Sequence, residues 1–484
     1  MEPTEYRIDF KKNVVSGIRW TAGVRILGKF ISWSITILVM RLLSPQDYGL
    51  MAIGTISISF LFQLHELGLG AILVQKKDLD ETTVRQVLAA LLVINFGFAL
   101  ILLFAAQLIG NFFNEQRVVP LIRFLSIIFI MSPFSLVPSA LLEREMRFRK
   151  KAIIDFISTM TGSVTTLILA LSGCGVWSLA WGELSINVSR VIGLNFFCSR
   201  LRTPSFGFKG IKEIIPFSGY MTIYRILWFI FNQADIFFVG KLLGKRLLGF
   251  YSVAMNLATL PMEKISVVFN QVALSAFARI QTDRVKVASH FLKAIRVVSF
   301  MSFPSTWGIS CIAPELVAVL LGDKWQMVAL PLQLLTVVVP LRMIANLMDP
   351  AVIGIGRPDI SLFNVLLASV LVPLGVIIGV HWGIVGVCIA WVIAFPLVFL
   401  GNLWRVSKVL GVRPSDVLSA MAGPALAGAV MAACVMAVKV IFGTNPKSIA
   451  HLALLITIGV MSCGIMVLVA NRKGYHEVLE LIRA

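Results

Sequence analysis

The sequence predicts an all-α protein that crosses a membrane many times. Of its 484 residues, 58% are hydrophobic and only 14% are charged, whereas a soluble chain is about a quarter charged. The hydrophobic residues form runs of about 20, the length that an α-helix needs to cross the hydrocarbon core. Most basic residues lie in the short gaps between runs, so the formal net charge of +19 indicates membrane topology rather than nucleic-acid binding.

About fourteen such runs follow one another, and each is predicted to be a transmembrane helix. Their approximate ranges are 15–40, 47–74, 85–109, 118–142, 152–171, 175–198, 215–240, 247–276, 295–321, 327–353, 360–381, 384–404, 417–441 and 448–470. The first run is interrupted by Arg19, Arg25 and Lys29 and has no small-residue cleavage site. We therefore expect a retained helix rather than a signal peptide. The segment 281–293 is interpreted as a separate, short amphipathic helix at the membrane surface.

The basic residues in the gaps predict the orientation. Gaps after even-numbered runs carry most of the cations, for example Arg144, Arg147 and Arg149, whereas gaps after odd-numbered runs carry few. The positive-inside rule then places the even-numbered gaps and both termini in the cytoplasm.

An internal repeat suggests two lobes. The string VRIL at 24–27 returns as YRIL at 224–227, and Arg41 and Lys241 keep the same register. Because each copy would hold six helices, an even number, the copies share one orientation and an axis along the membrane normal. The predicted lobes are 1–200 and 201–405, and 406–484 adds two helices and a cytoplasmic tail.

Ionisable residues inside the runs carry the functional hypothesis, because each costs roughly 2.5–3.5 kcal/mol to insert. Arg25 and Arg225 occupy equivalent positions, which suggests a cationic site where the lobes face each other. Snorkelling is the alternative for Arg25 and for Lys29 on the same helix face. Lys264 follows Pro261 in the middle of a run. It either takes part in the functional site or forms an ion pair with a neighbouring helix.

Carboxylates in the runs are candidates for gating or ion coupling: Glu66, Asp235, Glu263 and Asp349. Asp349 lies seven residues after Arg342, so both share one helix face and either line a cavity or neutralise each other. Asp235 either offers oxygens to a cation or is solvated near the outer end of its helix. Glu66 precedes Gly68, where either a hinge or close packing is expected. Glu183 and Arg190, also seven apart, are predicted to form a structural pair.

Four strings now give a family resemblance. They are LLSPQDYGL at 42–50, ELGLG at 66–70 with QKK at 75–77, FARIQTD at 277–283, and LVAVLLGDKW at 316–325. They resemble the pattern of Wzx-type polysaccharide flippases in the multidrug/oligosaccharidyl-lipid/polysaccharide exporter superfamily, and the resemblance covers essentially the whole chain.

The resemblance implies a V-shaped pair of lobes in a bacterial inner membrane that flips undecaprenyl-pyrophosphate-linked oligosaccharide by alternating access. Its implied partners are that carrier-linked glycan, membrane lipids, a polysaccharide polymerase and the export machinery. It implies no enzyme activity, cofactor or metal, and coupling to Na⁺ or H⁺ stays open. The expected cationic cavity gives five candidate substrate-binding residues: Arg25, Lys29, Arg225, Lys264 and Arg342.

Two other classes of function are possible for such a chain. A drug exporter of the same superfamily would bind organic cations and line its cavity with carboxylates, whereas the deep charges here are more often basic. A membrane-embedded polymerase or ligase would present catalytic side chains on a long outer loop, and no loop of that kind stands out. Both features favour the flippase.

Overall fold

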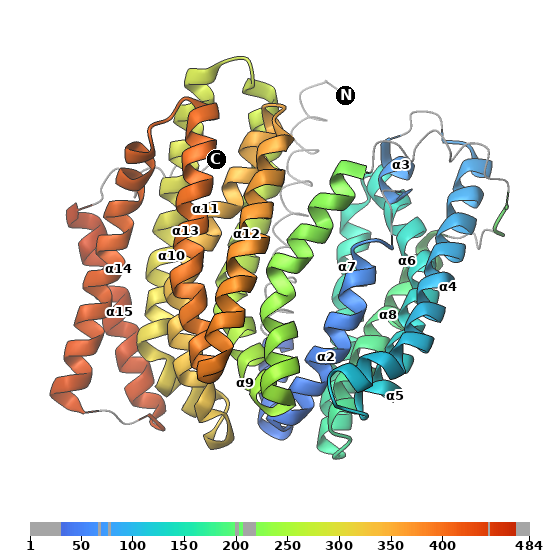
Figure 1. Cartoon of the computed structure of the whole chain (residues 1–484), viewed down its shortest axis with the longest axis horizontal. Helices are drawn as coiled ribbons and strands as arrows, with labels where there is room; N and C mark the ends of the chain where they lie inside the picture. Colours follow the sequence, from blue (N-terminus) through green and yellow to red (C-terminus); the bar gives the residue numbers. More distant parts are fainter. Residues whose placement is uncertain are drawn as a thin grey trace, which may run out of the picture. The chain divides into compact units, whose positions relative to one another are not determined.

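The computed structural model describes residues 31–65, 69–75, 79–198, 203–206, 219–443 and 446–470. Every regular element in these ranges is a helix (Figure 1). By length and composition, nine helical stretches of the described chain could cross a membrane. The prediction of an all-α polytopic membrane protein is confirmed, while the number of fourteen helices and the two-lobe repeat stay predictions.

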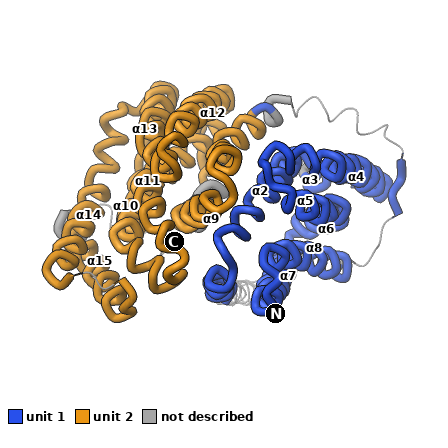
Figure 2. The backbone as a smooth tube through the Cα atoms, turned by 60° about the horizontal axis from the view of Figure 1, so that its bottom comes forward, with its two compact units in different colours: residues 1–223 blue, residues 224–484 orange. Residues whose placement is uncertain are grey.

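The chain divides into two compact units, residues 1–223 and residues 224–484 (Figure 2). In unit 1, an apolar helical segment at Ile31–Leu42 precedes the labelled helices. These are α2 (Pro45–Phe62), α3 (Leu69–Gln75), α4 (Glu81–Phe112), α5 (Val118–Leu125), α6 (Ile127–Arg144), α7 (Phe148–Leu171) and α8 (Val176–Cys198).

Unit 2 begins inside α9 (Gly219–Ile280) and contains the remaining helices. These are α10 (Arg284–Leu320), α11 (Ala329–Gly354), α12 (Pro358–Gly379), α13 (Gly383–Leu410), α14 (Pro414–Phe442) and α15 (Ile449–Ala470), with 3₁₀ turns at Asp323–Val328 and Val380–Trp382. Large apolar side chains such as Val440 and Ile441 are exposed on these helices. Their exposure fits a surface that faces lipid.

The start of α2 explains part of the family string at 42–50. The Ser44 hydroxyl accepts a hydrogen bond from the backbone N–H of Asp47 at 3.3 Å, and the Asp47 carboxylate accepts one from the backbone N–H of Ser44 at 2.9 Å. Pro45 is the first helical residue, where its missing N–H costs nothing. The string therefore encodes a capping box that fixes the beginning of a helix.

Helices α7 and α8 are in close backbone contact at two glycines. A Cβ atom added to Gly162 would lie 2.7 Å from the carbonyl oxygen of Gly182, and one added to Gly182 would overlap the Thr166 hydroxyl. Small residues allow helix backbones to approach in membranes, where packing drives association. This contact holds the α7–α8 pair together.

Two of the membrane-crossing stretches contain a break. The stretch Ile223–Met262 has 40 residues and Pro358–Leu410 has 53, both longer than the roughly 20 that one crossing needs. The first is interrupted at Gly244, whose φ of 79° and ψ of 171° are not helical. The second is interrupted at Val380–Trp382 and at Gly383, whose φ is 70°. Glycine adopts this left-handed backbone without strain.

Two predicted boundaries are wrong. The run 47–74 is not one helix, since α2 ends at Phe62 and α3 begins at Leu69. The segment 281–293 does not form a separate surface helix, because α10 begins at Arg284 and continues to Leu320. Asp283 caps this long helix, and no glycine or proline interrupts it before Pro304.

Candidate functional site

A buried polar cluster in unit 2 begins at Asp235 on α9. The hydroxyl of Tyr251, also on α9, donates a hydrogen bond to Asp235 Oδ2 at 2.6 Å. Sixteen residues would separate the two by about 24 Å along a straight helix. The break at Gly244 is what allows the chain to fold back and bring these side chains together.

Asp235 accepts two further hydrogen bonds. The indole N–H of Trp391 on α13 lies 3.1 Å from Oδ2, and the backbone N–H of Ile236 lies 2.7 Å from Oδ1. Asp235 is only 1% exposed, which rules out one of its two predicted alternatives, that it is solvated near the outer end of the helix. The three donors occupy most of the acceptor sites of this carboxylate and fix its position.

Arg342 on α11 lies beside this cluster and is 6% exposed. Its guanidinium carbon lies 4.4 Å from the centroid of the Trp391 ring, a cation–π contact. Its Nη2 lies 3.4 Å from Asn232 Oδ1, and its Nη1 lies 3.6 Å from the Met255 sulfur. Among the described side chains it forms no ion pair with a carboxylate. Because arginine carries five N–H donors, most of them remain available to an anion.

Arg342 lines a pocket of about 80 Å³ inside unit 2, which has room for several water molecules. Its lining combines carboxamides and one carboxylate with aromatic rings, namely Asn232, Asn346, Asp349, Asn364, Asn402, Trp228, Phe231 and Phe395. Within the described residues, two buried atoms of this lining have no hydrogen-bond partner, the Asn364 Nδ2 donor and the Asn402 Oδ1 acceptor. Buried polar atoms are normally bonded, so these two indicate a polar ligand or water.

Asp349 belongs to the same pocket. Its Oδ2 accepts a hydrogen bond from the Tyr224 hydroxyl at 3.0 Å. Seven residues separate Asp349 from Arg342, and both side chains line one cavity, which is one of the two arrangements that their spacing allowed. The pocket therefore presents one positive and one negative group together with neutral hydrogen-bonding side chains.

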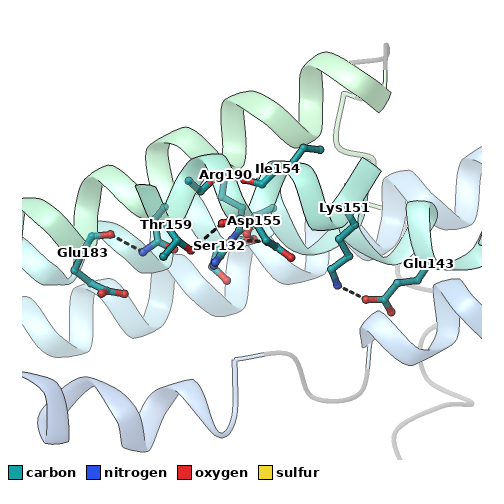
Figure 3. A network of polar contacts seen from close by, with 11 residues as sticks. Ser132, Glu143, Lys151, Ile154, Asp155, Thr159, Glu183 and Arg190 are labelled. Atoms are coloured by element: carbon teal, nitrogen blue, oxygen red, sulfur yellow. Dashed lines mark hydrogen bonds and ion pairs between the residues drawn. The ribbon is translucent and has the colours of Figure 1, made fainter. Parts of the chain in front are cut away.

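Unit 1 has a polar network of its own between α6, α7 and α8 (Figure 3). Arg190 Nε lies 3.2 Å from Asp155 Oδ1, and Lys151 pairs with Glu143. Glu183 and Arg190, predicted to pair, interact electrostatically, but the direct contact of Arg190 is with Asp155 of the neighbouring helix α7.

The other predicted site residues are placed only in part. Arg25, Lys29 and Glu66 lie outside the described residues. Glu263 and Lys264 lie on α9, but their side chains are outside the description. Arg225 lies on α9 and is half-buried.

Sequence reasoning missed the aromatic and amide members of the cluster, Tyr251, Trp391, Asn364 and Asn402. Polar atoms on these side chains inside apolar runs were the available signal.

Residues 38–330 match the model of a family described as polysaccharide biosynthesis protein. The chain is 25% identical over 397 residues to the lipopolysaccharide biosynthesis protein WzxC of Escherichia coli K12, which covers 80% of this chain and 79% of the relative. It is 24% identical over 476 residues to the succinoglycan biosynthesis transport protein ExoT of Rhizobium meliloti. That alignment covers 98% of this chain and 96% of the relative.

Solved structures show the same fold. The lipid II flippase MurJ in an inward closed conformation has a TM-score of 0.74 at 16% identity, and the match covers 92% of this chain and 98% of that one. A multidrug resistance transporter of the MATE family in an inward-facing conformation has a TM-score of 0.60 at 17% identity, with 78% and 93% covered.

Proposed function

This chain belongs to the polysaccharide biosynthesis protein family, and we propose that it is a flippase for lipid-linked oligosaccharide units. Its relatives carry names of polysaccharide biosynthesis and transport, and its fold is that of a lipid II flippase. It is a transporter of a polysaccharide precursor and not an enzyme. In detail, it moves undecaprenyl-pyrophosphate-linked repeat units from the cytoplasmic to the outer leaflet of a bacterial inner membrane by alternating access.

The observation that carries the site assignment is the buried guanidinium of Arg342. A diphosphate that leaves water needs replacement partners, and arginine can donate two parallel hydrogen bonds to phosphate oxygens. Arg342 is held by the Trp391 ring on one side while most of its N–H groups remain available on the pocket side. We assign to this pocket a contact with one phosphate or an adjoining sugar hydroxyl, because it is too small for a whole oligosaccharide.

The remaining basic candidates, Arg25, Lys29, Arg225 and Lys264, complete the proposed cationic path. Glu66, Asp235, Glu263 and Asp349 remain candidates for gating or for coupling to Na⁺ or H⁺. Asp235 would act in this scheme by orienting Trp391, which in turn supports Arg342. Both termini are proposed to face the cytoplasm, with polymerase and export machinery as partners.

The fold also suits a drug exporter, since a MATE transporter shares it. The pocket argues for the flippase. The carboxylate of Asp349 already accepts a hydrogen bond from Tyr224, whereas Arg342 forms no ion pair within the described part of the chain, and its positive charge would repel an organic cation. Membership of the polysaccharide biosynthesis family points in the same direction.

The test replaces Arg342 with glutamine and, separately, with lysine. Purified variants are reconstituted in vesicles, and flipping of a fluorescent lipid-linked oligosaccharide is followed by accessibility to an external quencher. We expect Arg342→Gln to lose about 10- to 100-fold in rate, because a hydrogen bond to a charged group contributes roughly 1.5–3 kcal/mol. Arg342→Lys should retain part of the activity, since it keeps the charge but loses the two-pronged contact.

Arg413→Gln is the matched control. It removes an exposed arginine of unit 2 that does not line the pocket. A wild-type flipping rate in Arg342→Gln, at normal yield and unchanged thermal unfolding, would remove Arg342 from the transport path.

A further inference from the structure

A second pocket, of about 370 Å³, opens where three chain connections of unit 2 meet. Its lining comes from the start of α10, the turn between α11 and α12, and the last turn of α13, namely Gln281, Arg284, Val287, Ile355, Arg357, Lys408, Val409 and Leu410. In the sequence these three connections follow even-numbered runs, which the positive-inside rule places in the cytoplasm. The pocket therefore lies at the predicted cytoplasmic surface.

Three cations line this pocket, one from each connection. Arg357 is paired, because its Nε and Nη2 donate to the two carboxylate oxygens of Asp359 at 2.9 and 2.8 Å. Lys408 lies over the ring of Trp404, with its Nζ 4.7 Å from the centroid. Among the described side chains, neither Lys408 nor Arg284 pairs with a carboxylate. Two positive charges therefore line one pocket without compensation.

The helix ends add to this positive charge. Arg284 is the first residue of α10, and Arg357 immediately precedes α12. The N-terminal end of a helix carries a partial positive charge, so cations are unfavourable there and anions are favoured. Asp283 does not neutralise Arg284 directly, because its carboxylate binds the backbone N–H and the ammonium group of Lys286. A bound anion between the two helix ends would therefore stabilise the positive charge of Arg284 and Arg357.

Apart from Gln281, the rest of the lining is apolar. Ile355 and Val409 are partly exposed and offer hydrocarbon surface next to the charged groups, whereas Val287 and Leu410 are buried. A free inorganic anion uses only the cations, whereas a lipid uses both, with the phosphate on the cations and the glycerol and upper acyl carbons on the apolar wall. Basic pockets between transmembrane helices at the cytoplasmic surface bind anionic headgroups in this way.

We propose that this pocket binds a phosphate group, and that the phosphate is the headgroup of an anionic phospholipid of the cytoplasmic leaflet. The bound lipid neutralises Arg284 and Lys408 and holds the ends of α10, α12 and α13 together. This site is separate from the Arg342 pocket, and no residue lines both. The proposal therefore does not depend on the substrate assignment made above.

The test measures binding to the full-length protein in detergent micelles. Native mass spectrometry titrates phosphatidylglycerol and, in a parallel arm, phosphatidylcholine, while thermal unfolding is followed with either lipid or with inorganic phosphate. We expect phosphatidylglycerol to bind and to raise the unfolding temperature, and phosphatidylcholine to do neither. Each removed charge should weaken phosphatidylglycerol binding about fivefold. The double variant Arg284→Gln/Lys408→Gln should therefore bind this lipid at least tenfold more weakly than wild type.

The double variant Lys286→Gln/Arg413→Gln is the control. It removes the same charge from exposed positions of unit 2 that do not line the pocket, and we expect its affinity to change less than threefold. An equal loss in both double variants would overturn the site, as would equal binding of the two lipids. If inorganic phosphate raised the unfolding temperature as much as phosphatidylglycerol at the same concentration, the proposal that the bound phosphate belongs to a lipid would be overturned. Flipping is not the readout, so a failure here is distinguishable from a failure of the Arg342 assignment.

Discussion

The ion pair between Lys439 and Glu315 gives a quantitative prediction about how α14 is attached to α10. Lys439 Nζ lies 2.7 Å from Glu315 Oε2 and 2.6 Å from the carbonyl oxygen of Cys311. The two side chains are 9% and 1% exposed. Each charge has therefore lost most of its contact with solvent and depends on the other for compensation.

Removing one partner should be far more damaging than removing both. We expect Glu315→Leu and Lys439→Met each to lower the free energy of unfolding by about 3–5 kcal/mol, because each leaves an uncompensated buried charge. The double variant Glu315→Leu/Lys439→Met should lie within about 1 kcal/mol of wild type or be more stable, since apolar packing replaces the pair. The double-mutant cycle should thus show a coupling energy of at least about 5 kcal/mol, the difference between the summed single losses and the small effect of the double variant.

A matched control exists in the same unit. Lys447 and Asp323 also pair at 2.8 Å, but their side chains are 65% and 62% exposed. An exposed pair contributes roughly 0–1 kcal/mol, so Lys447→Met should change stability little. Reversible unfolding in mixed micelles, followed by tryptophan fluorescence, measures all four variants. Losses below about 1 kcal/mol for both single variants of the buried pair, or strictly additive effects, would refute the reasoning.

Three further predictions concern the rest of the chain. Gly182→Ala should destabilise the protein by about 1–3 kcal/mol, because the added Cβ would overlap the Thr166 hydroxyl. Gly97→Ala should not destabilise it, because nothing lies within 4 Å of the added Cβ. Thermal unfolding of both variants checks this difference. Asp235→Ala should cost about 1.5–3 kcal/mol of stability, since it removes the charged acceptor of Tyr251 and Trp391, and near-ultraviolet circular dichroism should report the altered tryptophan environment. Alanine at both Arg25 and Arg225 should reduce export of lipid-linked oligosaccharide in cells at normal protein levels, and undiminished export would exclude both from the mechanism.

The sequence by itself determined the fold class, the family resemblance and several local features. Runs of about 20 apolar residues dictate helices that cross a membrane, because every backbone polar group must be satisfied within the segment. The spacing of Arg342 and Asp349 placed both on one face of a helix, and in the structure both line the same pocket. These properties depend on helical periodicity within one segment, which a sequence displays directly.

Only the tertiary structure decided which side chains meet. Asp235 binds Tyr251 because the chain folds back at Gly244, and Arg190 pairs with Asp155 of α7 rather than with Glu183 of its own helix. The second pocket of unit 2 likewise combines connections that lie more than a hundred residues apart, from Arg284 to Lys408. Such contacts depend on how helices pack and turn relative to one another, and periodicity within a single helix carries no information about its neighbours.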